Sequence, residues 1–136
     1  MNIIVSNENR NVPVTVVRLE GRLDGQTFET LIAKAKELYD GGARNILLDL
    51  AELTYISSAG IVSLHTIALM LRGEAAPDPE HGWAAVKAAE RTREVGVQKH
   101  IKFLNLRPEV YSVLEMVGLT AFFENFTDLE TALKSF

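Results

Sequence analysis

The sequence contains no cysteine among its 136 residues. This absence excludes disulfides, thiolate catalysis and cysteine-based zinc sites, and it fits a reducing cytosol. No apolar run approaches the roughly 20 residues that a membrane-spanning helix needs. The first ten residues, MNIIVSNENR, carry no basic residue ahead of their short apolar stretch, which makes a poor signal peptide. We therefore expect a cytoplasmic protein that does not insert into a membrane.

Clustered positive charge is also missing. The net charge is −4, and the densest basic group, Lys87, Arg91 and Arg93, is interleaved with Glu90 and Glu94. A surface that follows a phosphate backbone needs unopposed lysine and arginine. Nucleic acid is therefore not an expected partner, and neither is an anionic membrane surface.

Cofactor and metal motifs are absent as well. The chain has no G-x-G-x-x-G and no P-loop GKS/T, so it lacks a nucleotide phosphate cradle. Its three histidines, His65, His81 and His100, show no metal-ligand spacing. We therefore expect no cofactor, no bound metal and no catalytic residue.

The composition that remains is that of one ordinary folded domain. Hydrophobic residues make up 47% and charged residues 24%, which predicts a normal core and argues against disorder. Apolar periodicity predicts alternating strands and helices. Strands are expected at 2–5, 12–19, 45–50, 101–106 and 121–126, and helices at 28–39, 57–71, 83–95, 108–117 and 129–136.

This order predicts an α/β fold in which residues 1–136 form a single domain. We expect a mixed sheet of four to five strands with helices packed mainly on one face. Residues 73–98 contain a proline-rich loop and the helix at 83–95, which can be a partner surface or mere decoration. Trp83, the single tryptophan, either packs that helix onto the domain or is exposed as an interface anchor.

Two adjacent serines stand where a strand gives way to a helix. In the first turn of a helix the backbone N–H groups lack intrahelical partners, and with the helix dipole they favour a negative group. A phosphate on Ser57 or Ser58 would add about −1.5 to −2 charges, which this position tolerates and an acidic or apolar partner would not. The simpler interpretation is that one serine only caps the helix. Asp24 has the same two interpretations, as a cap of the helix at 28–39 or as a binding residue.

The segment at 45–64, NILLDLAELTYISSAGIVSL, resembles the signature of STAS domains, the family of bacterial anti-sigma factor antagonists. The match consists of Asp49-Leu50 at a strand end, Tyr55-Ile56, and the turn Ser57-Ser58-Ala59-Gly60. Gly21-Arg22-Leu23-Asp24 is similar to the family's G-x-L-D element, and Val117-Gly118-Leu119 to the end of its closing helix.

The resemblance implies a phosphoprotein that regulates transcription by partner switching. The serine two positions before the turn glycine, Ser58, would accept the phosphate, with Ser57 as the second choice. Partner binding would involve Asp24, Ser57, Ser58, Ala59 and Gly60. The unphosphorylated domain would bind an anti-sigma factor serine kinase, which phosphorylates it and releases it, and a serine phosphatase would reset it. No enzyme activity is expected, and a homodimer remains open.

Two departures keep alternatives open. Many regulated members have aspartate where this chain has Ser57, and the insertion at 73–98 is not part of a compact member. STAS-like domains also serve as scaffolds that are not phosphorylated, in stress-sensing assemblies and as small subunits of lipid-transport ATPases. A remote alternative is a serine hydrolase, because Ser58-x-Gly60 fits half of the G-x-S-x-G elbow, but Ile56 replaces the first glycine.

Overall fold

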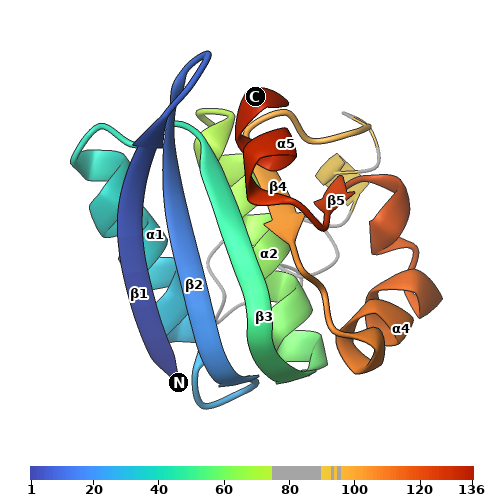
Figure 1. The fold of residues 1–136 in the computed structure, drawn as a ribbon. Coiled ribbons are helices and arrows are strands. Elements are labelled where there is room, and N and C mark those ends of the chain that lie inside the picture. Colours follow the sequence, from blue (N-terminus) through green and yellow to red (C-terminus); the bar gives the residue numbers. More distant parts are fainter. Residues whose placement is uncertain (75–89, 93, 95) are drawn as a thin grey trace.

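The computed structural model describes residues 1–74, 90–92, 94 and 96–136, and they form a sheet layered with helices (Figure 1). The elements are β1 (Asn2–Asn9), β2 (Pro13–Leu23), α1 (Phe28–Asp40), β3 (Ile46–Ile56), α2 (Ser58–Leu71), β4 (Ile101–Leu104), α4 (Pro108–Met116), the 3-10 turn η1 (Leu119–Ala121), β5 (Asn125–Phe126) and α5 (Leu129–Lys134). The order of strands and helices predicted from the sequence is confirmed over this part of the chain.

The sheet has five strands in the order β1-β2-β3-β4-β5. The first two strands form an antiparallel hairpin, and every later pairing is parallel. The predicted mixed sheet is therefore confirmed. Because β2, β3 and β4 are parallel, their carboxyl ends lie at one edge, the lower edge in Figure 1.

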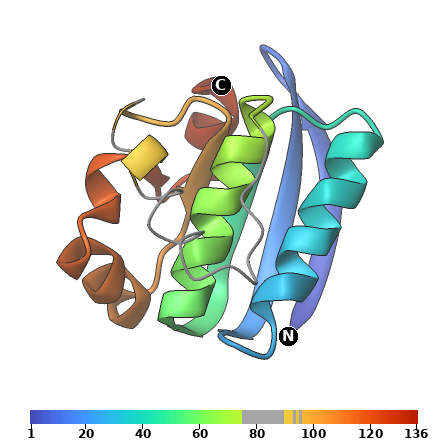
Figure 2. The same cartoon turned by 180° about the vertical axis from the view of Figure 1, so that it is seen from behind.

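Helices α1 and α2 lie side by side across one face of the sheet (Figure 2). They bury the main core together with α4, and short α5 closes a smaller core on the other face. The main core includes Leu19, Leu31, Leu48, Leu64, Ile67, Phe103 and Leu114. The smaller core comprises Val14, Val16, Leu47, Leu104, Ala132 and Leu133. The prediction that the helices pack mainly on one face is thus confirmed.

Each of the five predicted strands had at least one wrong boundary. β1 continues to Asn9 instead of ending at residue 5, and β2 continues to Leu23 instead of ending at residue 19. β3 continues to Ile56 instead of ending at residue 50. β4 stops at Leu104, because Asn105 takes a left-handed backbone with φ of 57°. Within 121–126 only Asn125–Phe126 is a strand, since residues 119–121 form a 3-10 turn that buries Leu119.

Of the predicted helix at 83–95, residues 90–92 and 94 are helical, and Thr92 is fully buried. Trp83, His81 and most of the predicted insertion lie outside the described residues. Whether 73–98 is a partner surface therefore stays a prediction.

Candidate functional site

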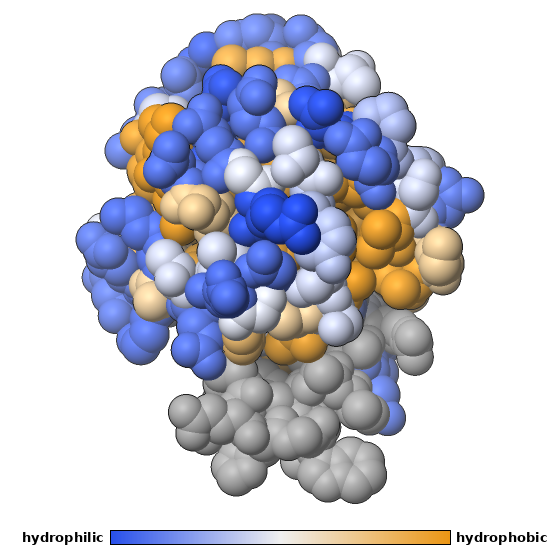
Figure 3. Space-filling view, turned by 90° about the horizontal axis from the view of Figure 1, so that it is seen from below, coloured by the Kyte–Doolittle hydropathy of each residue, from blue (hydrophilic) through white to orange (hydrophobic). Residues whose placement is uncertain are grey.

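The candidate site lies where two parallel strands end and two helices begin. Leu23 at the end of β2 is paired with Ile56 at the end of β3, so the residues that follow them leave the sheet next to each other. Asp24 follows the first and Ser57 the second. Figure 3 views the molecule from this edge, where a mainly polar centre is bordered by apolar surface.

Ser57 and Ser58 have different structural roles. Ser57 is the N-cap of α2, and its Oγ accepts a hydrogen bond of 3.3 Å from the Gly60 N–H. Its own N–H donates to the Leu23 carbonyl of β2 at 2.9 Å. Ser58 is the first helical residue, and its side chain is exposed, whereas Ser57 and Ala59 are half-buried. Ser57 is therefore the helix cap, and Ser58 is the exposed residue that remains the candidate phosphate acceptor.

The first turn of α2, at the positive end of the helix dipole, contains amide N–H groups without a protein acceptor among the described residues. Within the described part of the chain, neither the Ser58 nor the Ala59 amide N–H donates to a protein acceptor. This turn contains no acidic residue. Unpaired amides at the start of a 14-residue helix form an environment that favours a negative group over a positive one. A phosphate on the Ser58 hydroxyl would be such a group.

Gly60 sets how closely α2 approaches the strand ends. A Cβ atom at this position would lie 2.7 Å from the Leu23 carbonyl oxygen and 2.8 Å from Ile56 Cγ1. Both distances are well inside van der Waals contact, so only glycine allows this approach. The predicted turn Ser57-Ser58-Ala59-Gly60 is thus a tightly packed junction with one exposed hydroxyl.

Asp24 organises the neighbouring junction from β2 to α1. Its Oδ1 accepts from the Gln26 N–H at 3.0 Å and from Thr27 Oγ1 at 3.3 Å, and Arg22 Nε lies 3.7 Å from Oδ2. The interpretation of Asp24 as the cap of α1 was wrong, because Thr27 occupies the N-cap position, although it makes no side-chain cap bond. The Gln26 amide hydrogen bond, with Thr27 and Arg22, lowers the pKa of the Asp24 carboxyl. Asp24 therefore has a structural role, and it lies at the same edge of the sheet as Ser58.

One pair at this edge was missed from the sequence. The Arg22 guanidinium lies 4.1 Å from the centre of the Tyr55 ring. Tyr55 is 41% exposed, and the two residues are cross-strand partners in β2 and β3. Their contact depends on strand register, which the sequence did not reveal. Both are residue types that often anchor protein interfaces.

A second missed residue is Arg107, which precedes α4. Its Nη1 donates to the Ala51 carbonyl of β3 at 3.4 Å, and its Nε donates to Glu109 at 2.6 Å. This hydrogen bond to the Glu109 carboxylate raises the pKa of Arg107 and lowers that of Glu109. The contact to Ala51 ties the start of α4 to β3.

The histidines are engaged away from Ser58. His65 is buried in α2, with Nδ1 2.9 Å from Thr92 Oγ1 and its ring edge-on to Phe123. His100 pairs with Asn45 at the opposite end of the sheet, and His81 lies outside the described residues. None of these contacts directs a base to the Ser58 hydroxyl, as a serine hydrolase requires. Among the described residues no cluster of three metal-ligating side chains occurs.

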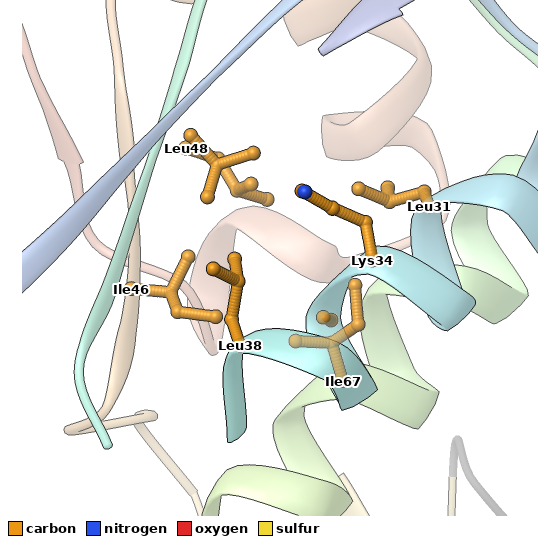
Figure 4. Close-up of a pocket in the computed structure, with 8 residues that line it drawn as sticks. Leu31, Lys34, Leu38, Ile46, Leu48 and Ile67 are labelled. Carbon is orange, nitrogen blue, oxygen red and sulfur yellow. The ribbon is translucent and has the colours of Figure 1, made fainter. Parts of the chain in front are cut away.

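A small cavity lies between α1 and the sheet (Figure 4). Its lining is apolar except for Lys34, with Val17, Leu31, Ala35, Leu38, Ile46, Leu48 and Ile67 around it. The cavity volume is about 10 Å³, which is at most the space of one water molecule. It is a packing gap in the core and leaves no room for an organic ligand.

Comparisons with known proteins agree with the junction and the topology. The family model described as "Mlab, STAS domain" matches residues 6–76, which contain Asp24 and Ser57 to Gly60. A candidate anti-sigma factor antagonist of Bordetella bronchiseptica, BtrV, is 28% identical over 118 residues, which cover 87% of this chain and 82% of BtrV.

Two solved structures share the fold. A candidate anti-sigma factor antagonist from Thermotoga maritima matches with a TM-score of 0.67 at 11% identity. The match covers 96% of this chain and 92% of the Thermotoga chain. The phosphorylated form of the Bacillus cell fate determinant SpoIIAA matches with a TM-score of 0.52 at 19% identity. The match covers 96% of this chain and 97% of the SpoIIAA chain.

No helix within the described residues is long and apolar enough to span a membrane. The family model covers more than half of the sequence, and it includes both strand-to-helix junctions of the candidate site. This chain therefore belongs to the STAS domain family.

Proposed function

We propose that this protein is an anti-sigma factor antagonist that acts by partner switching, with Ser58 as the phosphorylated residue. The observation that carries the proposal is the exposed Ser58 hydroxyl at a helix start whose first two amide N–H groups are unpaired in the described chain. The BtrV relative supports the same function. The protein would act in the cytoplasm as a binding protein without enzyme activity of its own.

The unphosphorylated domain binds an anti-sigma factor serine kinase through the edge that carries Ser58, which frees the sigma factor. The kinase then transfers the γ-phosphoryl group of ATP to Ser58 Oγ. The new oxygen–phosphorus bond replaces the bond to ADP, and the hydroxyl proton leaves to a base on the kinase. A serine phosphatase removes the phosphate and resets the cycle.

Ser58 suits a switch because its phosphorylation alters binding without unfolding the domain. Its side chain is exposed and supports no internal hydrogen bond among the described residues. The added charge of about −1.5 to −2 lies at the positive end of α2, so the fold tolerates it. The same charge would have to be desolvated in a tightly packed interface, so the partner is released.

Ser57 is the poorer acceptor. Its hydroxyl is half-buried and accepts the Gly60 N–H, so a kinase would have to break the cap in order to reach it. Asp24, Ala59 and Gly60 contribute to partner binding by shaping the edge around Ser58.

Phosphorylation by an anti-sigma factor serine kinase tests the proposal. Intact-mass spectrometry after incubation with ATP should show one added phosphate on the wild type and none on Ser58→Ala. Ser57→Ala is the matched control and should still be phosphorylated. Phosphorylation of Ser58→Ala but not of Ser57→Ala would show that Ser57 is the acceptor. A wild type that stays unmodified would contradict the partner-switching proposal.

The second candidate function is a scaffold subunit that is never phosphorylated. It is favoured by the family model, whose description names Mlab. Partner binding by Ser58→Asp separates the two functions in a titration experiment. The switch predicts that this variant loses the partner while Ser58→Ala keeps it, whereas the scaffold predicts equal binding by both. Hydrolysis of a general ester substrate by the wild type would instead support the serine hydrolase alternative.

A further inference from the structure

The two edges of the sheet differ in how they are protected. The β5 edge is only two residues long and leads directly into α5. The β1 edge is eight residues long, and no described strand pairs with its outer side. Figure 1 shows β1 at the border of the sheet. An edge strand of this length presents a row of backbone N–H and C=O groups to any other strand.

β1 lacks most of the features that usually block an edge. It contains no proline and no lysine, and Glu8 is its one charged side chain. Its pairing with β2 runs through eight consecutive residue pairs without a bulge. Ile4 on this strand is 51% exposed, although it is a large aliphatic residue. A regular, nearly uncharged edge with exposed apolar surface favours the addition of another strand.

We propose that β1 pairs with β1 of a second copy of this chain, in antiparallel orientation, so that the two sheets join across a two-fold axis. This dimer goes beyond the proposed function and does not depend on it. A two-fold contact places the same surface patch on both partners, so the strand has to complement itself.

The strand complements itself in one register better than in the other. Directly paired residues must lie on the same face of the joined sheet, so the axis passes through a residue and not between two residues. An axis at Val5 or at Ser6 pairs seven of the eight residues of β1, whereas an axis at Ile4 or at Asn7 pairs only five. With the axis at Val5, Val5 meets its own copy, Ile4 meets Ser6, and Asn2 meets Glu8. This register opposes no like charges and brings apolar atoms together. With the axis at Ser6, Glu8 would face Ile4, which is a poorer pair.

The dimer leaves the candidate site accessible. Ser58 lies at the carboxyl edge of the parallel strands, whereas β1 forms the lateral border of the sheet (Figure 1). Each dimer would therefore present two Ser58 residues, one from each copy. A contact made by one strand pair is small, so we expect a weak dimer whose population depends on protein concentration.

Sedimentation velocity at rising concentration tests the association. The wild type should shift from a 15.1 kDa monomer toward a dimer, and Ile4→Glu/Ser6→Glu should weaken the association about tenfold by opposing like charges in the joined strands. Each glutamate is compatible with the monomer, because Ile4 pairs with Arg18 and Ser6 is exposed. Asn125→Glu on the β5 edge is the matched control and should dimerise like the wild type.

A cysteine at the axis tests the register. The chain has no cysteine of its own, and directly paired Cα atoms at about 4.5–5.5 Å are within disulfide range. Val5→Cys should cross-link into a dimer when oxidised glutathione accepts the electrons, while Asn2→Cys and Asn125→Cys should remain monomeric. A wild type that stays monomeric up to about 1 mM, an undiminished dimer in the double glutamate variant, or equal cross-linking at all three cysteines would each overturn the proposal.

Discussion

The β2–α1 junction and the β3–α2 junction leave the sheet side by side, yet they prepare the following helix differently. At the first, negative charge is already present, because Asp24 accepts the Gln26 amide and Glu29 lies in the first turn of α1. At the second, no acidic residue lies in the first turn of α2, and two amides stay unpaired in the described chain. A new negative charge is therefore better accommodated at Ser58 than at the start of α1.

The two junctions also differ in packing. Gly60 touches the end of β2 so closely that a Cβ atom would overlap the Leu23 carbonyl oxygen. Gly25 in the other junction has no atom within 4 Å of its would-be Cβ. One glycine is thus required by close contact, and the other occupies open space.

Gly60→Ala should give the largest effect. The methyl group must push α2 away from backbone atoms that cannot yield, which should cost about 1–3 kcal/mol of unfolding free energy. The matched variant Gly25→Ala should lie within about 0.5 kcal/mol of the wild type. Urea denaturation of both proteins measures the difference. Equal midpoints would show that α2 does not depend on this close approach.

Ser57→Ala should have the next largest effect. It removes the oxygen that accepts the Gly60 N–H, and loss of such a cap typically costs about 1 kcal/mol. The loss should appear as a lower denaturation midpoint with an unchanged slope. A midpoint equal to that of the wild type would mean that Ser57 does not stabilise the start of α2.

Asp24→Asn should lower stability by a smaller, pH-dependent amount. The hydrogen bonds to the carboxylate lower the pKa of Asp24 in the folded protein, so its contribution is present above the unfolded pKa of about 3.9. It is lost as the pH falls through the folded pKa. The gap between wild type and variant, measured by urea denaturation, should be largest near neutral pH and should close in acid. A gap that widens in acid would contradict this sign.

Ser58→Ala should have the smallest effect on stability. The side chain is exposed and makes no hydrogen bond within the described residues, so the unfolding free energy should change by less than about 0.5 kcal/mol. Thermal and urea denaturation beside Ser57→Ala check this contrast. A loss as large as that of Ser57→Ala would give Ser58 a structural role and weaken its assignment as a switch.

Much of the fold was predictable because local chemistry marks the helix starts. Pro108 opens α4, and Asp128 caps α5 by accepting a hydrogen bond of 2.9 Å from the Thr131 N–H. The end of β3 was not predictable in the same way. Its inward residues Leu50, Leu53 and Ile56 are three apart instead of two, because the pairing with β2 contains register shifts. Such spacing does not look like a strand in the sequence.

The amino-acid sequence by itself determined which segments fold, where α2 begins, and which serines stand at that point, because apolar periodicity and capping chemistry are local. Only the tertiary structure decided which serine is the cap and which is exposed, since that depends on the Ser57 bond to β2 and the fit of Gly60 against Leu23. It also brought Arg22 onto Tyr55. These contacts join residues more than thirty positions apart, and their geometry follows from strand register.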